Sequence, residues 1–333
     1  MEIGFAFFDK NTHKIVQHHA QELGVHHAIA NAEWSGGFGT YIHPWDYMPL
    51  LKTKLDMAEY GMKFDVLEGV NFIDAAKLGT PDRDKAIDHF ISLLENMSKL
   101  GIKVCCYNWM PVWGWFRSEQ NRILPGGASV TAFDASVIPT EPITELGHVT
   151  KQQLWDNLEY FLKAVVPYAE KFRVKLAIHP DDPPVENIGG IERILTSAEA
   201  MQRVIDLVPS EYNGITMCQG CFAAMGEDVP GQIRKFGSEN KIFFAHFRDI
   251  SGERNCFQEE FHNTGKTDMY SAMRAYYEIG FDGVIRPDHV PTMTHDVMEE
   301  QGYGINGNLY AAGYMVGMME SIEHDLLSAE VRN

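Results

Sequence analysis

The sequence predicts an α/β protein in which eight parallel strands close into a barrel surrounded by helices. Eight short apolar segments recur along the 333 residues, and helical patterns separate them. The apolar segments are continuous rather than alternating, which is typical of parallel strands covered on both faces. The length suits one such barrel. The alternative, a doubly wound sheet, usually has a glycine-rich phosphate loop after its first strand, and this sequence has none there.

The expected strands span residues 3–8, 26–30, 63–69, 103–108, 175–180, 214–218, 242–247 and 283–288. The longest irregular stretch, residues 111–150, follows the fourth of them. A loop of that length inside a compact domain usually forms a lid or an active-site wall. The sequence therefore predicts one (β/α)8 barrel domain over residues 1–333, with a lid or loop insertion at about 111–150.

Helical segments between the strands carry end signals and helical spacing. Residues 80–82 (Thr-Pro-Asp) predict a helix with Thr80 as N-cap, and Gly101 predicts its end. Thr196 and Glu199 fit a capping box that opens the helix after the fifth strand. Apolar residues at helical spacing predict one helix after the fourth strand and one near the end of the chain: Leu154, Leu158, Phe161 and Val165, then Leu309, Met315, Met318 and Met319.

The composition is that of a globular protein with a large core, because hydrophobic residues make up 45% and charged residues 22%. A formal net charge of −18 disfavours nucleic acid and anionic membranes as partners, but it permits a small anionic substrate. The sequence has no run of about 18 apolar residues and no signal-peptide pattern, so we expect no membrane span and no export. The five cysteines are expected to be reduced thiols in a cytoplasmic protein.

Four successive expected strands end in side chains that can bind a metal. The active site of a parallel barrel lies at the C-terminal ends of its strands. The fifth to eighth strands present at those ends His179, Cys218, His246 and Asp288. Each residue alone has a structural explanation, but their coincidence at one rim predicts a metal centre. Two imidazoles, a thiolate and a carboxylate suit Zn, Fe or Mn.

Three further residues near these strand ends have chemical interpretations. Cys221, in Cys218-Gln219-Gly220-Cys221, fits half of a structural zinc site or a redox motif, although a second spaced pair and a thioredoxin-like context are both missing. His289 directly follows Asp288 and can transfer a proton. Tyr303 lies in a glycine-flanked loop before the last helix, where the alternative is a packed loop aromatic.

A series of motifs in chain order resembles the bacterial mannonate dehydratases. The resemblance covers about residues 55–322, and its most specific motif is the run His-Pro-Asp-Asp-Pro-Pro at residues 179–184. The others are Lys-Leu-Gly-Thr-Pro-Asp-Arg-Asp at 77–84, Cys-Tyr-Asn-Trp-Met-Pro-Val at 106–112, Asn-Gly-Ile-Thr-Met-Cys at 213–218, His-Phe-Arg at 246–248, Arg-Pro-Asp-His at 286–289 and Gly-Tyr at 302–303.

The resemblance implies a xylose-isomerase-like TIM barrel and dehydration of D-mannonate to 2-dehydro-3-deoxy-D-gluconate, a step of hexuronate breakdown. It implies Mn²⁺ or Fe²⁺ bound by His179, Cys218, His246 and Asp288. It also implies His289 and Tyr303 as the catalytic pair. We favour His289 as acid and Tyr303 as base, and the opposite assignment stays open because an unperturbed tyrosine with a pKa of ~10 is a poor base.

Substrate contacts are expected from six residues around the rim and in the insertion: Asn108, Trp115, Arg117, Asp181, Arg248 and Arg286. An arginine fork matches a carboxylate bidentately, which makes the arginines candidates for holding a sugar acid. Arg83 is a weaker candidate, since a surface salt bridge also explains it. The family precedent makes a homodimer plausible.

One segment departs from the family pattern. Residues 114–118 read Gly-Trp-Phe-Arg-Ser, whereas the family usually has Asp-Trp-Thr-Arg-Thr. The change removes a carboxylate and a hydroxyl, so substrate identity is less firmly predicted than reaction class. The alternatives are a dehydratase for a different aldonic acid, a metal-dependent sugar isomerase or epimerase, or a barrel that binds sugar acids without turnover. Isomerase sites usually contain Glu and Asp ligands, unlike this rim.

Overall fold

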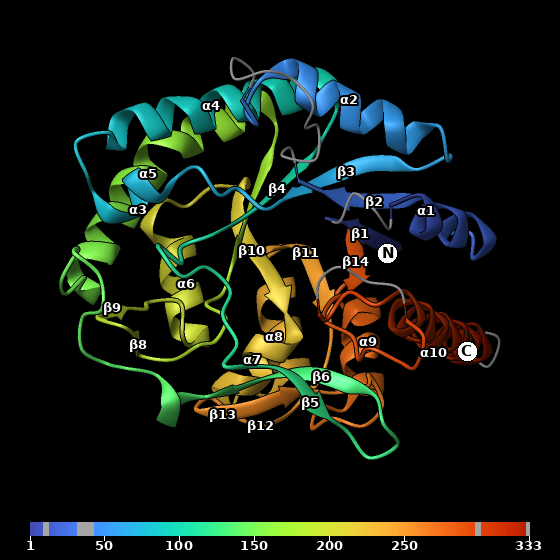
Figure 1. Ribbon diagram of the computed structural model, residues 1–333. Coiled ribbons are helices and arrows are strands. Elements are labelled where there is room, and N and C mark those ends of the chain that lie inside the picture. The colour runs from blue at the N-terminus through green and yellow to red at the C-terminus, as the bar shows by residue number, and fades with distance from the viewer. Residues whose placement is uncertain (9–12, 32–42, 297–300, 331–333) are drawn as a thin grey trace.

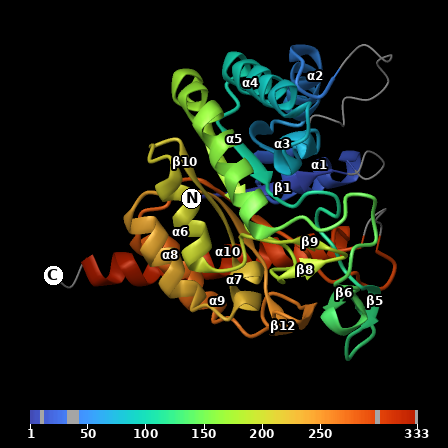
Figure 2. The same cartoon turned by 90° about the vertical axis from the view of Figure 1, so that its left-hand side faces the viewer.

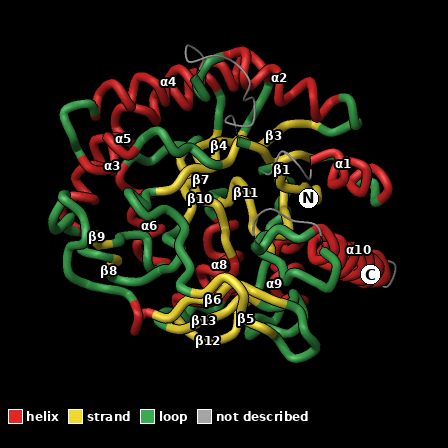
Figure 3. The backbone as a smooth tube through the Cα atoms, viewed as in Figure 1, coloured by secondary structure: helices red, strands yellow, loops and turns green. Residues whose placement is uncertain are grey.

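The centre of the molecule is a closed parallel barrel (Figures 1 and 3). The computed structural model describes residues 1–8, 13–31, 43–296 and 301–330. Within them, eight strands close in the order β1–β14–β11–β10–β7–β4–β3–β2. Their bounds are β1 Glu2–Phe7, β2 His27–Ala30, β3 Lys63–Glu68, β4 Val104–Asn108, β7 Lys175–His179, β10 Asn213–Cys218, β11 Ile242–Phe247 and β14 Val284–Pro287.

The eight expected strands are confirmed, each within one residue at either end. Continuous apolar runs identified them because these strands are covered on both faces: β10 and β11 are buried along their whole lengths. Side chains such as Val66, Val104 and Phe244 form a cluster separate from the larger core that packs against the helices. The predicted barrel is therefore correct in strand number, position and parallel direction.

Helices cover the outside of the barrel, as Figures 1 and 2 show. They are α1 His13–Glu22, α2 Tyr47–Ala58, α3 Asp74–Leu78, α4 Arg83–Leu100, α5 Lys151–Phe172, α6 Ala198–Leu207, α7 Gln219–Met225, α8 Val229–Ser238, α9 Met269–Glu278 and α10 Ile305–Glu330. Among the described residues, none of the helices is both long and apolar enough to cross a membrane.

Two predicted helix starts are wrong by one or two residues. The N-cap of α4 is Asp82, not Thr80, because the chain is still in a turn there and the Thr80 carbonyl accepts from the N–H of the first helical residue. Gly101 ends α4 in the left-handed conformation, as predicted. The N-cap of α6 is Ser197 rather than Thr196, and its side chain accepts from the Ala200 N–H.

Residues 111–150, the expected lid or loop insertion, are only partly irregular. They contain the hairpin of β5 (Glu119–Ile123) and β6 (Ser129–Asp134) and a short 3-10 helix (Ala135–Val137). The hairpin joins β12 (Ile250–Glu253) and β13 (Cys256–Glu259), which follow β11, in an antiparallel sheet of order β12–β13–β6–β5. We call these four strands the accessory sheet, and Figure 1 shows it at the bottom of the view.

Polar composition explains why the hairpin escaped prediction. β5 reads Glu-Gln-Asn-Arg-Ile and none of its residues is buried. An apolar run or a clear alternation is the signal for a strand, and β5 has neither. A second small ribbon, β8 (Asn187–Ile188) with β9 (Ile191–Glu192), likewise lies in a loop after a barrel strand. Such insertions follow the strand ends, which places them around the mouth of the barrel.

Candidate active site

A cavity of about 190 Å³ lies at the C-terminal ends of the barrel strands. Eight of the residues singled out from the sequence line it: Asn108, Trp115, His179, His246, Arg286, Asp288, His289 and Tyr303. Cys218, at the end of β10, is completely buried beside this wall. The parallel register explains the convergence, because Asn108 pairs with His179 across β4 and β7, and Cys218 pairs with His246 across β10 and β11.

The four predicted ligands come together in three dimensions. One donor atom each of His179, Cys218 and His246 lie within 4.8 Å of one another. His179 Nε2 is 3.2 Å from His246 Nδ1. Asp288 Oδ2 is 3.5 Å from His246 Nδ1 and 3.9 Å from Cys218 Sγ. Two imidazoles, a thiol and a carboxylate at these separations suit one divalent transition metal.

Neighbouring groups orient one of these donors and lower the pKa of another. His179 Nδ1 lies 2.6 Å from the Pro180 carbonyl, so the ring donates there and leaves Nε2 facing the other donors. Burial raises the pKa of the Cys218 thiol, but a hydrogen bond from Cys221 and the charge of Arg248 lower it well below its usual value. Cys218 is thereby stabilised as a thiolate, the form that binds metals.

The glycine of the Cys-Gln-Gly-Cys segment has a steric explanation. A Cβ at Gly220 would overlap Nε and the side-chain carbons of Arg248. Arg248 Nη2 in turn donates to Cys221 Sγ at 3.3 Å. Gly220 therefore leaves room for the Arg248 side chain at the start of α7. Cys221 interacts with the thiol of Cys218 and not with a second pair of cysteines.

A carboxylate that the sequence analysis did not identify lies on the other side of His246. Glu68 Oε1 is 3.2 Å from His246 Nε2. Arg286 binds Glu68 through Nε and Nη2, at 3.1 and 3.0 Å, and reaches Asp288 Oδ1 at 2.9 Å. Burial and the positive charge of Arg286 both lower the pKa of His246. The carboxylates of Glu68 and Asp288 outweigh these two effects and raise the pKa to about 10. Glu68 and Arg286, which also line the cavity, thus hold His246 and Asp288 in place.

A buried ion-pair network lies behind the cavity. Arg117 donates to both oxygens of Asp182, at 2.6 and 3.0 Å, and to Glu259 at 2.7 Å. Arg248 donates to the same two carboxylates, at 2.8 and 2.9 Å. Burial raises the pKa of Asp182, but Arg117 and Arg248 hold it far below its usual range. Removing one member would leave an uncompensated buried charge.

His289 connects this network to the cavity. Its Nδ1 is 3.2 Å from Glu259 Oε1 and contacts an N–H of Arg248. A neutral ring with a bare Nδ1 accepts from Arg248, whereas a protonated ring donates to Glu259. Tyr303 packs edge-on against the His289 ring with centroids 5.4 Å apart, and Trp115 lies 4.8 Å away. The site therefore presents an imidazole and a phenol side by side at the cavity wall.

Three expected substrate contacts do not line the cavity. The guanidinium groups of Arg117 and Arg248 are enclosed and paired with carboxylates. Asp181 is also fully buried, and its Oδ2 accepts backbone N–H groups at 3.0 and 2.7 Å. The adjacent Asp182 lines the cavity instead. Arg83 stacks on Tyr160 at the surface of α4 and also takes no part.

Glu68 and Glu259 differ in how they could have been found. Glu68 ends β3, so the strand-end rule applied to the fifth to eighth strands also identifies it. Glu259 lies on β13, outside the barrel, and no spacing in the sequence connects it to His289. Its position depends on the accessory sheet, which the sequence pattern did not predict.

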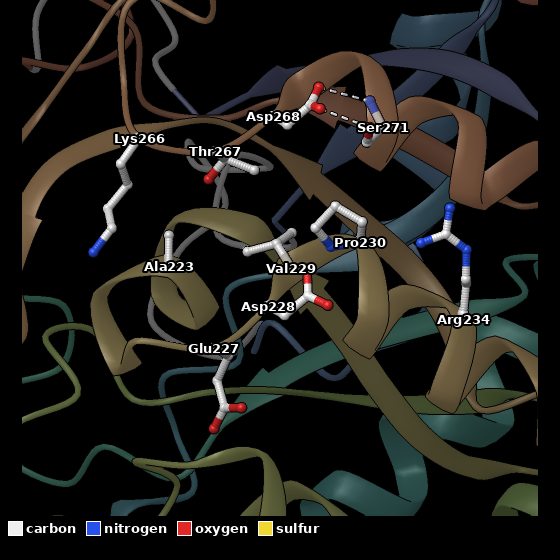
Figure 4. Close-up of a pocket in the computed structure, with 10 residues that line it drawn as sticks. All are labelled: Ala223, Glu227, Asp228, Val229, Pro230, Arg234, Lys266, Thr267, Asp268 and Ser271. Atoms are coloured by element: carbon white, nitrogen blue, oxygen red, sulfur yellow. Dashed lines mark hydrogen bonds between the residues drawn. The ribbon is translucent and has the colours of Figure 1, made fainter.

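A larger pocket, of about 450 Å³, lies at the start of α8 and α9 (Figure 4). No histidine or cysteine lines it. Two of its three acidic side chains have structural partners: Asp268 accepts from the Ser271 N–H, and Glu227 accepts from Gln232 and from the Ala198 N–H. The smaller cavity at the barrel mouth therefore contains the groups that can carry chemistry.

Known proteins resemble this chain along most of its length. The family profile described as D-mannonate dehydratase (UxuA) matches residues 1–149 and 141–328. A mannonate dehydratase from Thermotoga neapolitana is 36% identical over 314 residues, covering 84% of this chain and 86% of the relative.

Solved structures agree with the sequence comparison. The crystal structure of mannonate dehydratase from Streptococcus suis serotype 2 has a TM-score of 0.90 at 32% identity, covering 98% of this chain and 94% of that one. A xylose isomerase domain protein from Planctomyces limnophilus has a TM-score of 0.59 at 13% identity, covering 97% and 98%. The second likeness concerns the fold alone, which is the xylose-isomerase-like TIM barrel expected from the sequence.

Proposed function

Because the chain belongs to the D-mannonate dehydratase family, we propose that it is a hydro-lyase that converts D-mannonate to 2-dehydro-3-deoxy-D-gluconate and water. The observation that carries this proposal is the convergence of His179, Cys218, His246 and Asp288 at the barrel mouth, with His289 and Tyr303 beside them. A sugar isomerase or epimerase on the same scaffold usually has several carboxylate ligands, whereas the ligand set proposed here has one, Asp288.

The proposed metal is Mn²⁺ or Fe²⁺, held by those four donors. Borderline metals of this kind accept imidazole, thiolate and carboxylate together and leave coordination positions for a substrate. When bound, such an ion polarises the substrate carboxylate and stabilises the negative charge that follows loss of the C2 proton. The side chains around it supply binding, orientation and proton transfer.

We assign Tyr303 as the base at C2 and His289 as the acid at the C3 hydroxyl. The positive charge of Arg286 interacts with Tyr303 at the cavity wall. Glu259 Oε1 lies 3.2 Å from His289 Nδ1 and can accept from it, which leaves an Nε2–H of the imidazolium to protonate the leaving oxygen. The C2–H electron pair forms the C2–C3 double bond as the C3–O bond breaks, and the resulting enol tautomerises to the 2-keto acid.

A different aldonic acid is the second candidate substrate. The position of Gly114 in the cavity supports this alternative. Gly114 and Trp115 line the cavity, so the missing family carboxylate would have faced the substrate. Phe116 and Ser118 lie outside the lining and make contacts with Asp182 and the accessory sheet. Of the departures in this segment, the one at Gly114 is therefore the one that can change selectivity.

Turnover of D-mannonate by metal-stripped and Mn²⁺-reloaded protein tests the proposal. We expect 2-dehydro-3-deoxy-D-gluconate to form only after reloading, and the C2 and C3 epimers of mannonate to react more slowly. Faster turnover of an epimer would replace the substrate but keep the reaction class. Isomerised or epimerised sugar without loss of water would refute the dehydratase assignment.

We also propose that the enzyme works in the cytoplasm as a homodimer. All five cysteines are free thiols, which suits a reducing compartment. Sedimentation velocity of the purified protein measures the assembly state, and a single species of 37.7 kDa would contradict the dimer.

A further inference from the structure

The side-chain amide of Asn108 is held in one orientation at the end of β4. Its Oδ1 accepts from the Met110 N–H at 3.0 Å and from Lys77 Nζ at 3.1 Å. Both partners can only donate hydrogen bonds, so the amide oxygen must face them and Nδ2 must point away. Among the described residues, Nδ2 has no hydrogen-bond partner, and Asn108 lines the cavity. Its two N–H groups are thus directed at the cavity as donors.

Lys77 is an unusual residue to find in this position. Only 2% of it is exposed, although a buried ammonium is costly unless it is paired. Its ion-pair partner is Asp74, one turn earlier on α3, at 3.0 Å. Asp74 also accepts from the Val112 N–H at 3.1 Å. Together they fix the start of the loop after β4, which explains why the Lys-Leu-Gly-Thr-Pro segment lies so close to the active site.

The donor lies next to the candidate metal centre. Asn108 and His179 are register partners on β4 and β7, so their side chains leave the same face of the barrel. A neutral amide N–H beside a cation-binding site suits an oxygen that carries negative charge. An N–H can also donate to the hydroxyl oxygen of a neutral ligand, but a hydrogen bond to a charged oxygen is about twice as strong.

We propose that Asn108 donates a hydrogen bond to an anionic oxygen of the substrate, either the carboxylate or the oxygen that gains charge as C2 loses its proton, and that Lys77 is the positioning residue that fixes this donor. The proposal rests on the proposed function, because it assigns a recognition role within that reaction. It identifies one wall of the cavity as selective for sugar acids over neutral polyols.

Asn108→Asp is the most direct variant to test this inference. It keeps the side-chain shape and an oxygen for Met110 and Lys77, but it turns a carboxylate toward the cavity. We expect kcat/KM for D-mannonate to fall about 10²–10³-fold, the range for loss of one charge-stabilising donor. Competitive inhibition by D-mannitol, which carries no charge, should change by no more than about twofold, and Mn²⁺ content should stay equal by elemental analysis.

Lys77→Met tests the positioning role. The amide keeps only the Met110 contact and can rotate, so we expect about a tenfold rise in KM, with the D-mannitol inhibition constant unchanged; tenfold corresponds to about 1.4 kcal/mol, a typical hydrogen bond. Lys85→Met is the matched control, because Lys85 is exposed on α4. Equal behaviour of the Lys77 and Lys85 variants would overturn the role of Lys77.

Equal weakening of D-mannonate and D-mannitol by Asn108→Asp, or no weakening, would overturn the role of Asn108. If the wild-type protein does not dehydrate D-mannonate, the proposed function fails. Calorimetric binding of D-mannonate and D-mannitol to the Mn²⁺-loaded proteins then decides the inference by itself. Selective loss of D-mannonate binding in Asn108→Asp would support it, and unselective or absent binding by the wild type would reject it.

Discussion

The barrel rim and the accessory sheet meet at one cavity, and they contribute to it in different ways. The rim supplies the four donors that face each other at the ends of β7, β10, β11 and β14. The sheet region supplies Arg117, which binds Asp182, and Glu259, which binds Arg248 and contacts His289; neither of the two lines the cavity. The rim thus determines which chemistry is available, and the sheet determines how its residues are held.

The largest expected effect comes from breaking the rim. Cys218→Ser replaces a stabilised thiolate with a hydroxyl that stays protonated, so we expect metal affinity to fall by more than the ~10–100-fold typical of residues that only support ligands. Metal content after dialysis and turnover should be lost together. Unchanged content by elemental analysis would remove Cys218 from the ligand set.

His289→Asn separates metal binding from proton transfer. Asparagine keeps a polar side chain but cannot act as an acid near neutral pH, so we expect turnover to fall ~10²–10⁴-fold while Mn²⁺ content is unchanged. Single-turnover kinetics with equal metal loading measures this. Activity at the wild-type level would contradict the role of His289.

Glu259→Gln tests how much the ion pairs of the accessory sheet contribute to stability. Loss of this charge leaves Arg117 and Arg248 partly unpaired in the interior, so we expect about 3–5 kcal/mol of lost unfolding free energy, with the metal retained by what remains folded. The matched control is Glu260→Gln, the residue directly after β13, whose carboxylate accepts from Ser251, Gln258 and Thr264. The control should cost about 1 kcal/mol by urea unfolding. Equal losses of unfolding free energy in the two variants would show that the buried ion pairs of Glu259 stabilise the protein no more than the hydrogen bonds of Glu260 do.

Acid should weaken the same network. Burial raises the pKa of Glu259, but Arg248 and Arg117 outweigh it and leave the pKa below the ordinary value of 4.5. A carboxyl with a lowered folded-state pKa stabilises the protein above its unfolded pKa and loses that contribution as pH falls through the folded pKa. Unfolding free energy should therefore decline below about pH 4.5, less steeply in Glu259→Gln. Parallel declines in the two proteins would contradict this.

The sequence predicted the barrel rim but not the accessory sheet. The barrel strands are continuous apolar runs, and parallel strands bring their C-terminal ends together, so the meeting of His179, Cys218, His246 and Asp288 at one rim could be predicted without a structure. β5 is polar and β12–β13 are short, so the accessory sheet left no comparable signal. Arg117 and Arg248 were therefore assigned to the substrate, whereas the structure pairs them with carboxylates that spacing could not connect to them.

The smallest expected effect is at the border between the two regions. Gly114→Asp restores the family carboxylate at a position where an added Cβ meets no atom within 4 Å. Aspartate tolerates the positive φ of 58° better than most residues, so we expect stability within ~1 kcal/mol and unchanged metal content. KM ratios between D-mannonate and its epimers should shift by about tenfold. Identical ratios would place selectivity elsewhere in the cavity.

Anomalous diffraction from a crystal of the Mn²⁺-loaded protein is the most direct test of the metal centre. We predict one strong peak among His179, Cys218, His246 and Asp288, with Glu68 outside the coordination sphere and behind His246. The neighbouring group of Glu68, Cys106 and His246 also has donor atoms within 4.8 Å of one another. A peak among those three residues, or at a site away from the barrel mouth, would contradict the proposed centre.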